Sequence, residues 1–95
     1  MTDYKIVRTQ NAGVFFAIVE NLEGNTATLK DSRRLWYWDG ASSLSELAVR
    51  GVSRPSKCKF PVPVESQKVF EVIEILDMTD AAVKSIKGVL EWTQH

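Results

Sequence analysis

The residues best suited to chemistry lie in one short stretch near the middle of the chain. Residues 33–40 read RRLWYWDG and hold two of the three tryptophans beside two adjacent arginines. Arginine offers planar donors for phosphate or carboxylate groups, and an indole ring can stack on a base or attract a cation. The combination indicates an anion or nucleotide site. Tryptophans in a strand also serve as core residues with arginines on a solvated rim, so both interpretations stay open.

A basic segment surrounds and follows this stretch. Lys30 to Lys59 holds seven basic and three acidic residues, which gives +4, although the whole chain has twelve of each sign and is neutral. A local positive patch on a neutral protein favours a compact anionic ligand or a matched protein surface over a long nucleic-acid track. The residues that we expect to converge on a ligand are Arg33, Arg34, Trp36, Trp38, Arg54, Lys57 and Lys59.

Enzymatic chemistry has little support in the sequence. The single histidine, His95, is the last residue, and the single cysteine, Cys58, leaves no pair for a disulfide or a zinc site. The five glycines are dispersed rather than gathered in a phosphate-binding loop. Asp31 and Asp39 flank the aromatic stretch, and we expect them to pair with Arg33, Arg34 or turn amides rather than to act as acid and base. We therefore expect a non-enzymatic protein without a cofactor or a metal ion.

The first forty residues predict a meander of four short strands. Three of them are Tyr4–Thr9, Val14–Val19 and Thr26–Lys30, separated by turn-forming residues. The fourth is the aromatic stretch, which Asp39 and Gly40 would end. Because side chains alternate along a strand, one face should carry Arg34, Trp36 and Trp38, and the other Arg33, Leu35 and Tyr37.

The second half of the chain predicts two helices and two further strands. Ser43 and Glu46 form a capping box that begins a helix of about two turns, and Thr79 can cap a second helix through Lys87. Cys58–Val64 holds two prolines and suits an edge strand. Lys68–Leu76 is the last strand, which a bulge could interrupt.

These elements predict one α+β domain over residues 1–95. We expect a small β-rich fold, with a curled antiparallel sheet or partial barrel of five to six strands and two short helices. The sequence shows no signal peptide and no apolar run of about 18 residues, so we expect a cytoplasmic protein. A chain of this size has a small core, and Trp92 near its end must pack on its own domain or on a neighbouring subunit, which favours a homo-oligomer.

Several blocks of the sequence resemble a family of small, functionally uncharacterised proteins encoded by tailed bacteriophages, prophages and bacteria. The blocks are NAGV at residues 11–14, RRLWYWDGA at 33–41, SLS at 43–45 followed by Leu47 and Ala48, GVSRP at 51–55 and CKFPVPV at 58–64. The similarity covers nearly the whole chain and weakens after Leu76, and the RRLWYWDGA block is specific. The family offers no catalytic or binding residues to transfer.

The resemblance implies a phage accessory origin, and short accessory proteins of this kind are often counter-defence factors. We therefore expect a protein that sequesters an anionic, nucleotide-like immune signal, with Arg33 and Arg34 on phosphate and Trp36 or Trp38 stacked on the base. The alternative is a protein-binding inhibitor of a host defence complex, or a phage structural or accessory protein, that uses the same patch. The zero net charge disfavours nucleic acid as the ligand, and no membrane partner is expected.

Overall fold

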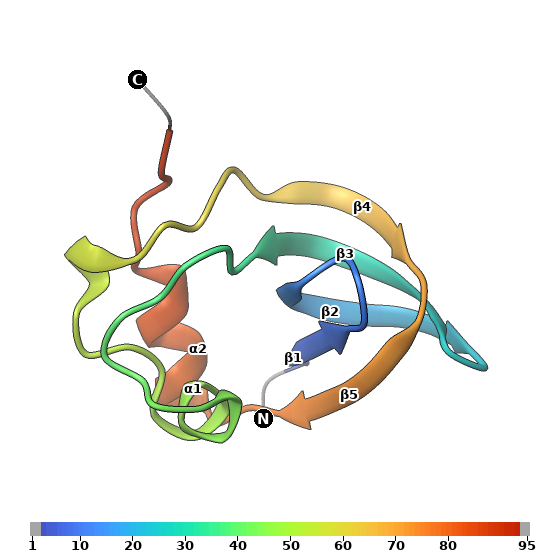
Figure 1. Cartoon of the computed structure of the whole chain (residues 1–95), viewed down its shortest axis with the longest axis horizontal. Helices are drawn as coiled ribbons and strands as arrows, with labels where there is room; N and C mark the ends of the chain where they lie inside the picture. The colour runs from blue at the N-terminus through green and yellow to red at the C-terminus, as the bar shows by residue number, and fades with distance from the viewer. Residues whose placement is uncertain (1–2, 94–95) are drawn as a thin grey trace.

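One antiparallel sheet of five strands organises the fold (Figure 1). The computed structural model describes residues 3–93. The strand order is β4-β3-β2-β1-β5, and two α-helices and a short 3-10 helix complete the domain. The expected α+β class, with a curled sheet and two short helices, is confirmed. The strands are β1 (Tyr4–Thr9), β2 (Val14–Glu23), β3 (Thr26–Arg34), β4 (Val64–Val69) and β5 (Val72–Asp77), and the helices are α1 (Leu44–Arg50), η1 (Pro55–Lys57) and α2 (Asp80–Lys87).

The sheet curls so strongly that its two outer strands follow one another in the chain. Only Phe70 and Glu71 join β4 to β5, and Glu71 has a φ of 58°. A hydrogen bond from the Val72 N–H to the Asn25 carbonyl, at 2.8 Å, stabilises this corner. The prediction of a single strand over Lys68–Leu76 is therefore wrong. The chain turns within that run and places its two halves on opposite edges of an unclosed sheet.

Alternation along the central strands divides the apolar side chains into two cores. Ile6 pairs with Phe16, and both side chains face the helices. Val7 pairs with Phe15, and both face the inside of the curl. The sheet is thus covered on one side by α1, α2 and their connections, and encloses a smaller core on the other.

Local capping sets the helix starts. The Ser43 hydroxyl accepts a hydrogen bond from the Glu46 N–H at 3.2 Å, and the Glu46 carboxylate accepts from the Ser42 N–H at 2.7 Å. At α2, the Thr79 hydroxyl accepts from the Ala82 N–H at 3.0 Å. Both predicted helices are confirmed. They could be predicted because each capping side chain bonds a backbone N–H within one turn of the helix. No helix within residues 3–93 is long and apolar enough to cross a membrane.

A β-bulge decides where the two arginines of the aromatic stretch point. β3 pairs Lys30 with Ile18 and Arg33 with Phe16, so two residues of β3 oppose one residue of β2 between these pairs. Asp31, with a φ of 50°, is one of the two. The bulge puts Arg33 on the helix-facing side of the sheet and Arg34 on the inner side.

The aromatic stretch itself leaves the sheet. β3 continues from the predicted strand Thr26–Lys30 across the bulge into the first two residues of the aromatic stretch and ends at Arg34, so the first forty residues form three strands rather than four. Beyond Arg34 the stretch has one isolated bridge, from Tyr37 to Lys59. The predicted strand at Cys58–Val64 is likewise reduced to isolated bridges before β4 begins, although β4 does form an edge of the sheet.

Candidate functional site

Three segments from distant parts of the chain lie side by side beyond the end of β3. The Tyr37 N–H donates to the Lys59 carbonyl at 3.3 Å, and the Lys59 N–H donates to the Tyr37 carbonyl at 2.7 Å. On the other side of this segment, the Trp92 N–H donates to the Phe60 carbonyl at 3.0 Å. Residues 58–60 therefore lie between the aromatic stretch and the C-terminal segment, and backbone hydrogen bonds fix the spacing of all three.

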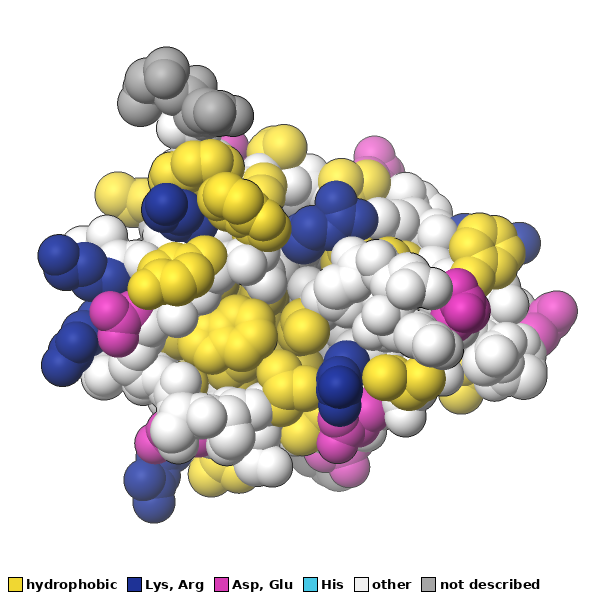
Figure 2. Space-filling view, viewed as in Figure 1, with side chains coloured by type: hydrophobic (Ala, Val, Ile, Leu, Met, Phe, Trp, Pro, Cys, Tyr) yellow, Lys and Arg dark blue, Asp and Glu magenta, His cyan; other side chains and the backbone are white. Residues whose placement is uncertain are grey.

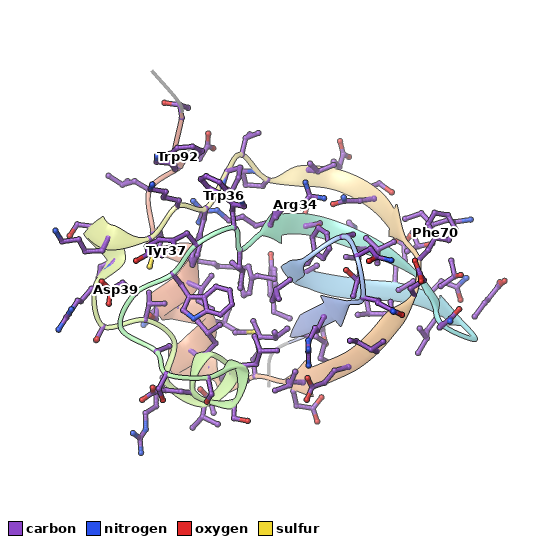
Figure 3. The ribbon with its side chains drawn as sticks, viewed as in Figure 1. Arg34, Trp36, Tyr37, Asp39, Phe70 and Trp92 are labelled. Atoms are coloured by element: carbon purple, nitrogen blue, oxygen red, sulfur yellow. The ribbon has the colours of Figure 1, made fainter. Side chains whose placement is uncertain are left out.

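This arrangement gathers three aromatic rings around one lysine, and we call Trp36, Tyr37, Lys59 and Trp92 the aromatic cluster. The Trp36 and Trp92 ring centroids are 4.9 Å apart with a tilt of 32°. The Lys59 Nζ atom lies 5.6 Å, 5.7 Å and 5.6 Å from the ring centroids of Trp36, Tyr37 and Trp92, within the range of cation–π attraction. Figure 3 shows the three labelled rings on the same side of the molecule.

The aromatic cluster is open to solvent. Trp36 is 58% exposed and Tyr37 is 50% exposed. In the space-filling view, hydrophobic side chains gather around a basic one on the upper left of the visible face (Figure 2). Large side chains that are left on the surface in this way offer apolar area to a partner.

Lys59 carries the charge of the aromatic cluster. The ion pairs among residues 3–93 involve Lys5, Arg8, Arg50 and Arg54, and none of them includes Lys59. The ring faces attract the Lys59 ammonium, but they do not neutralise it. The cluster is therefore a cationic surface with donors available for an anion.

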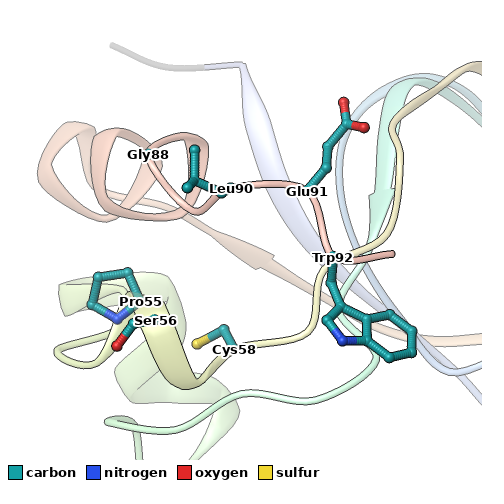
Figure 4. Close-up of a pocket in the computed structure, with 7 residues that line it drawn as sticks. All are labelled: Pro55, Ser56, Cys58, Gly88, Leu90, Glu91 and Trp92. Atoms are coloured by element: carbon teal, nitrogen blue, oxygen red, sulfur yellow. The ribbon is translucent and has the colours of Figure 1, made fainter. Parts of the chain in front are cut away.

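A hollow adjoins the aromatic cluster, between η1 and the C-terminal segment (Figure 4). We call it the apolar slot. Its volume is about 460 Å³, which falls in the range of small-molecule pockets. Leu90, which is 86% exposed, lies beside it. The residues that line the slot are Pro55, Ser56, Cys58, Gly88, Leu90, Glu91 and Trp92.

Cys58 is a structural residue within the lining of the apolar slot. The side chain is only 7% exposed. Its sulfur accepts a hydrogen bond from the Asp39 N–H at 3.5 Å, and the thiol can donate to the Arg54 carbonyl at 3.5 Å. Cys58 thus ties the start of η1 to the end of the aromatic stretch.

Arg33 does not join the aromatic cluster. The residue is 6% exposed, and its guanidinium donates to the carbonyls of Pro61, Ile86 and Phe60 at 3.3 Å, 3.2 Å and 3.3 Å. Burial lowers the pKa of Arg33, and the Glu91 carboxylate partly opposes that effect. The expectation that Arg33 binds a ligand phosphate is therefore corrected, because all three of its nitrogens already bind backbone carbonyls.

Arg34 and Trp38 also depart from the expected common face. The Arg34 side chain is exposed, and its central guanidinium carbon lies 4.9 Å from the centroid of the Phe15 ring. Trp38 is half-buried and packs against the core between the sheet and the helices, so its ring is not an open stacking surface. The predicted alternation fails because the chain leaves the sheet after Arg34.

Arg54 and Lys57 lie at η1 and are exposed. The Arg54 Nη1 atom is 3.4 Å from the Asp39 Oδ1 atom, so Asp39 pairs with Arg54 and not with Arg33 or Arg34 as expected. Among the described residues, no hydrogen bond, ion pair or cation–π contact links the side chain of Arg54 or Lys57 to the aromatic cluster. Of the seven predicted site residues, the structure brings together Trp36 and Lys59, with Arg34 two positions before Trp36.

Sequence reasoning missed three residues at this surface, namely Tyr37, Leu90 and Trp92. The available signal was the lone tryptophan near the chain end, which had to pack somewhere. Within residues 3–93, no group of three or more His, Cys, Asp or Glu side chains could hold a metal ion. His95 lies outside the described residues.

Fold and site together define a small α+β domain with an exposed, cationic aromatic surface. Residues 2–86 match a family described as a domain of unknown function, DUF6948, and the chain belongs to this family. Searches of curated proteins and of solved structures found no match. The family match ends before Leu90 and Trp92, so the C-terminal part of the site lies beyond the matched residues.

Proposed function

We propose that this chain is a non-enzymatic binding protein that engages a protein partner through the aromatic cluster and the apolar slot. The proposal depends on one observation: three aromatic rings converge at the surface on a lysine that has no carboxylate partner among the described residues. Aromatic side chains predominate in the hot spots of protein interfaces and are enriched at interface cores. The neighbouring slot offers a recess that a side chain of the partner can occupy.

The nucleotide-binding role is the second candidate. It is favoured by the Trp36 ring, which is 58% exposed with the Lys59 ammonium 5.6 Å away, since a base could stack there and a phosphate could contact Lys59 and Arg34. It ranks second because the Arg33 guanidinium binds backbone carbonyls and Trp38 packs against the core. The loss of Arg33 leaves few cations at the surface for a phosphate-rich ligand.

The biological setting of the proposal comes from the resemblance of the RRLWYWDGA block to phage-encoded proteins. In that setting the protein acts in the host cytoplasm as a counter-defence factor. Its partner is then a component of a host defence complex, and in the second candidate the nucleotide is an immune signal.

A homo-oligomeric state is proposed from a second apolar region. Phe70 is 60% exposed and Ile73 on the edge strand β5 is 52% exposed. Figure 3 places Phe70 at the far end of the sheet from the aromatic cluster. Self-association through Phe70 and Ile73 would leave the aromatic cluster free. Analytical sedimentation of the wild type and of an Ile73→Lys variant tests this contact. A dimer that persists in the variant would contradict it.

The experiment that tests the protein-binding proposal compares two exposed aromatic residues. Wild type, Trp36→Ala and Phe70→Ala are immobilised and incubated with host lysate, and captured proteins are quantified. We expect one stoichiometric partner that is retained by Phe70→Ala and lost by Trp36→Ala. Equal capture by all three proteins would contradict the assignment of the surface.

Calorimetry with cyclic nucleotides and ADP-ribose derivatives separates the two candidates. Heat of binding that the Arg34→Ala and Trp36→Ala variants both lose would favour the nucleotide-binding role. Absence of heat with every ligand would remove that role and leave the protein-binding proposal standing.

A further inference from the structure

The aromatic cluster and the apolar slot form one continuous surface. Trp92 belongs to both, because its ring packs on Trp36 and the residue also lines the slot. A single short segment of a partner could therefore occupy both features at once. The chemistry of each feature indicates what that segment must carry.

The apolar slot fits a large apolar side chain. Pro55 and Leu90 supply carbon surface, and Gly88 adds no side chain to fill the space. Glu91 is the one charged residue of the lining, and Figure 4 shows its carboxylate directed away from Pro55 and Cys58. A partner side chain in the slot would thus meet mainly hydrocarbon, which favours burial of an apolar group.

Lys59 fits a carboxylate. Its ammonium lies among three rings that exclude part of the surrounding water, and it has no ion-pair partner within residues 3–93. A charge-assisted hydrogen bond to a carboxylate is stronger there than on an open surface, because the local dielectric constant is lower. A basic group on the partner would meet repulsion at the same position.

We infer that this surface recognises a short linear peptide segment that carries one large apolar residue for the slot and one Asp or Glu for Lys59. Because Lys59 Nζ is 5.6 Å from the Trp92 ring that borders the slot, the two residues should be about two or three positions apart in an extended segment. This inference rests on the proposed function, since it specifies the partner of the same surface.

The test is a selection of random displayed peptides on the full chain, followed by affinity measurements in solution. We expect enriched peptides to pair an apolar residue with an acidic one. Lys59→Gln should weaken their binding about tenfold or more, and Lys59→Arg should largely retain it. Replacing the peptide Asp or Glu by its amide should weaken binding as much as Lys59→Gln does, with the protein sequence unchanged.

The slot is tested separately by filling it. Ser56 lines the slot, so Ser56→Phe should abolish binding, whereas Ser45→Phe on the exposed side of α1 should not. Peptides that depend on Trp36 but lack an acidic residue, or that bind Lys59→Gln as well as wild type, would overturn this inference and leave the proposed function intact. A selection that returns no peptide dependent on Trp36 would also overturn this inference, whereas the proposed function is decided by the capture of a partner from host lysate.

Discussion

The Arg33 guanidinium donates to the Phe60 carbonyl at 3.3 Å, and its central carbon lies 5.5 Å from the centroid of the Phe60 ring. The same carbonyl accepts the Trp92 N–H at 3.0 Å. A buried cation thus supports the segment on which the aromatic cluster is assembled. Arg33 contributes to the site through backbone carbonyls, without lying on its surface.

Replacement of Arg33 should be far more costly than replacement of Arg34. Arg33→Met removes three charge-assisted hydrogen bonds to buried backbone, so we expect the free energy of unfolding to fall by about 3 kcal/mol or more. The Phe60 and Ile86 carbonyls keep the N–H groups of Trp92 and Val89 as donors, whereas the Pro61 carbonyl loses the guanidinium. Arg34→Met removes an exposed cation–π contact and should cost about 1 kcal/mol or less. Urea denaturation measures both, and equal losses would contradict the structural role of Arg33.

Trp36 and Trp92 should be energetically coupled. Their rings are in direct contact, so a double-mutant cycle with alanine at both positions should give a coupling energy of about 0.5–1.5 kcal/mol. The control cycle pairs Trp36→Ala with Phe70→Ala, two residues at opposite ends of the molecule in Figure 3, and should be additive within about 0.5 kcal/mol. An additive Trp36–Trp92 cycle would show that the contact is not formed in solution.

Two glycines with positive φ should respond differently to alanine. Gly51 has a φ of 74° and Gly24 a φ of 61°, so either substitution strains the backbone by about 1–3 kcal/mol. At Gly51 the added methyl group would also collide with the Ser85 side chain, whose hydroxyl accepts from the Val52 N–H at 3.0 Å and joins the two helices. At Gly24 it meets open space. Thermal unfolding should therefore show a clearly larger loss for Gly51→Ala, and a similar loss in both variants would contradict this packing.

Glu46 should contribute to the loss of stability in acid. Hydrogen bonds from the Ser42 N–H and hydroxyl, with a smaller effect of Arg50, lower the pKa of Glu46 below its ordinary value of 4.5. Since the folded state binds the proton more weakly than the unfolded state, this stabilisation is present above pH 4.5 and is lost as the pH falls through the lowered pKa. A titration of the Glu46 carboxyl carbon by NMR checks the direction. The Glu46→Gln variant should show a shallower decline of melting temperature with acid, and a Glu46 pKa above 4.5 would contradict the cap geometry.

The helices could be predicted from the sequence because their signals are local. Ser43 with Glu46, and Thr79 with the first turn of α2, form bonds to residues three positions away. The strand β1 and the start of β2 were equally accessible, since turn residues separate two apolar runs, but β2 continues beyond the predicted Val19 to Glu23. Each of these elements is specified within one short window of the chain.

The corner between β4 and β5 could not be predicted in this way. The run from Lys68 to Leu76 contains no glycine or proline, and glutamate rarely adopts the positive φ that Glu71 takes. The bulge at Asp31 is similar, because only pairing with β2 reveals the extra residue in β3. Tertiary packing overrides local preference at both positions.

The site was predictable in its residue types but not in its assembly. Trp36 and Lys59 are both among the residues predicted to bind a ligand, yet their contact depends on hydrogen bonds from residues 58–60 to two other segments. Arg33 and Arg34 are indistinguishable by type. Which of them is buried depends on the bulge and on the Ile86 carbonyl at the end of α2, which no local pattern reveals.

The position of Trp92 beyond the last helix affects how the protein can be handled and regulated. A protease that cut the chain between α2 and Trp92 would detach one ring of the aromatic cluster while leaving the strands and both α-helices intact. A tag inserted beside Trp92 would crowd that ring. A tag ahead of β1, which Figure 1 shows well away from the C-terminal segment, leaves it unobstructed.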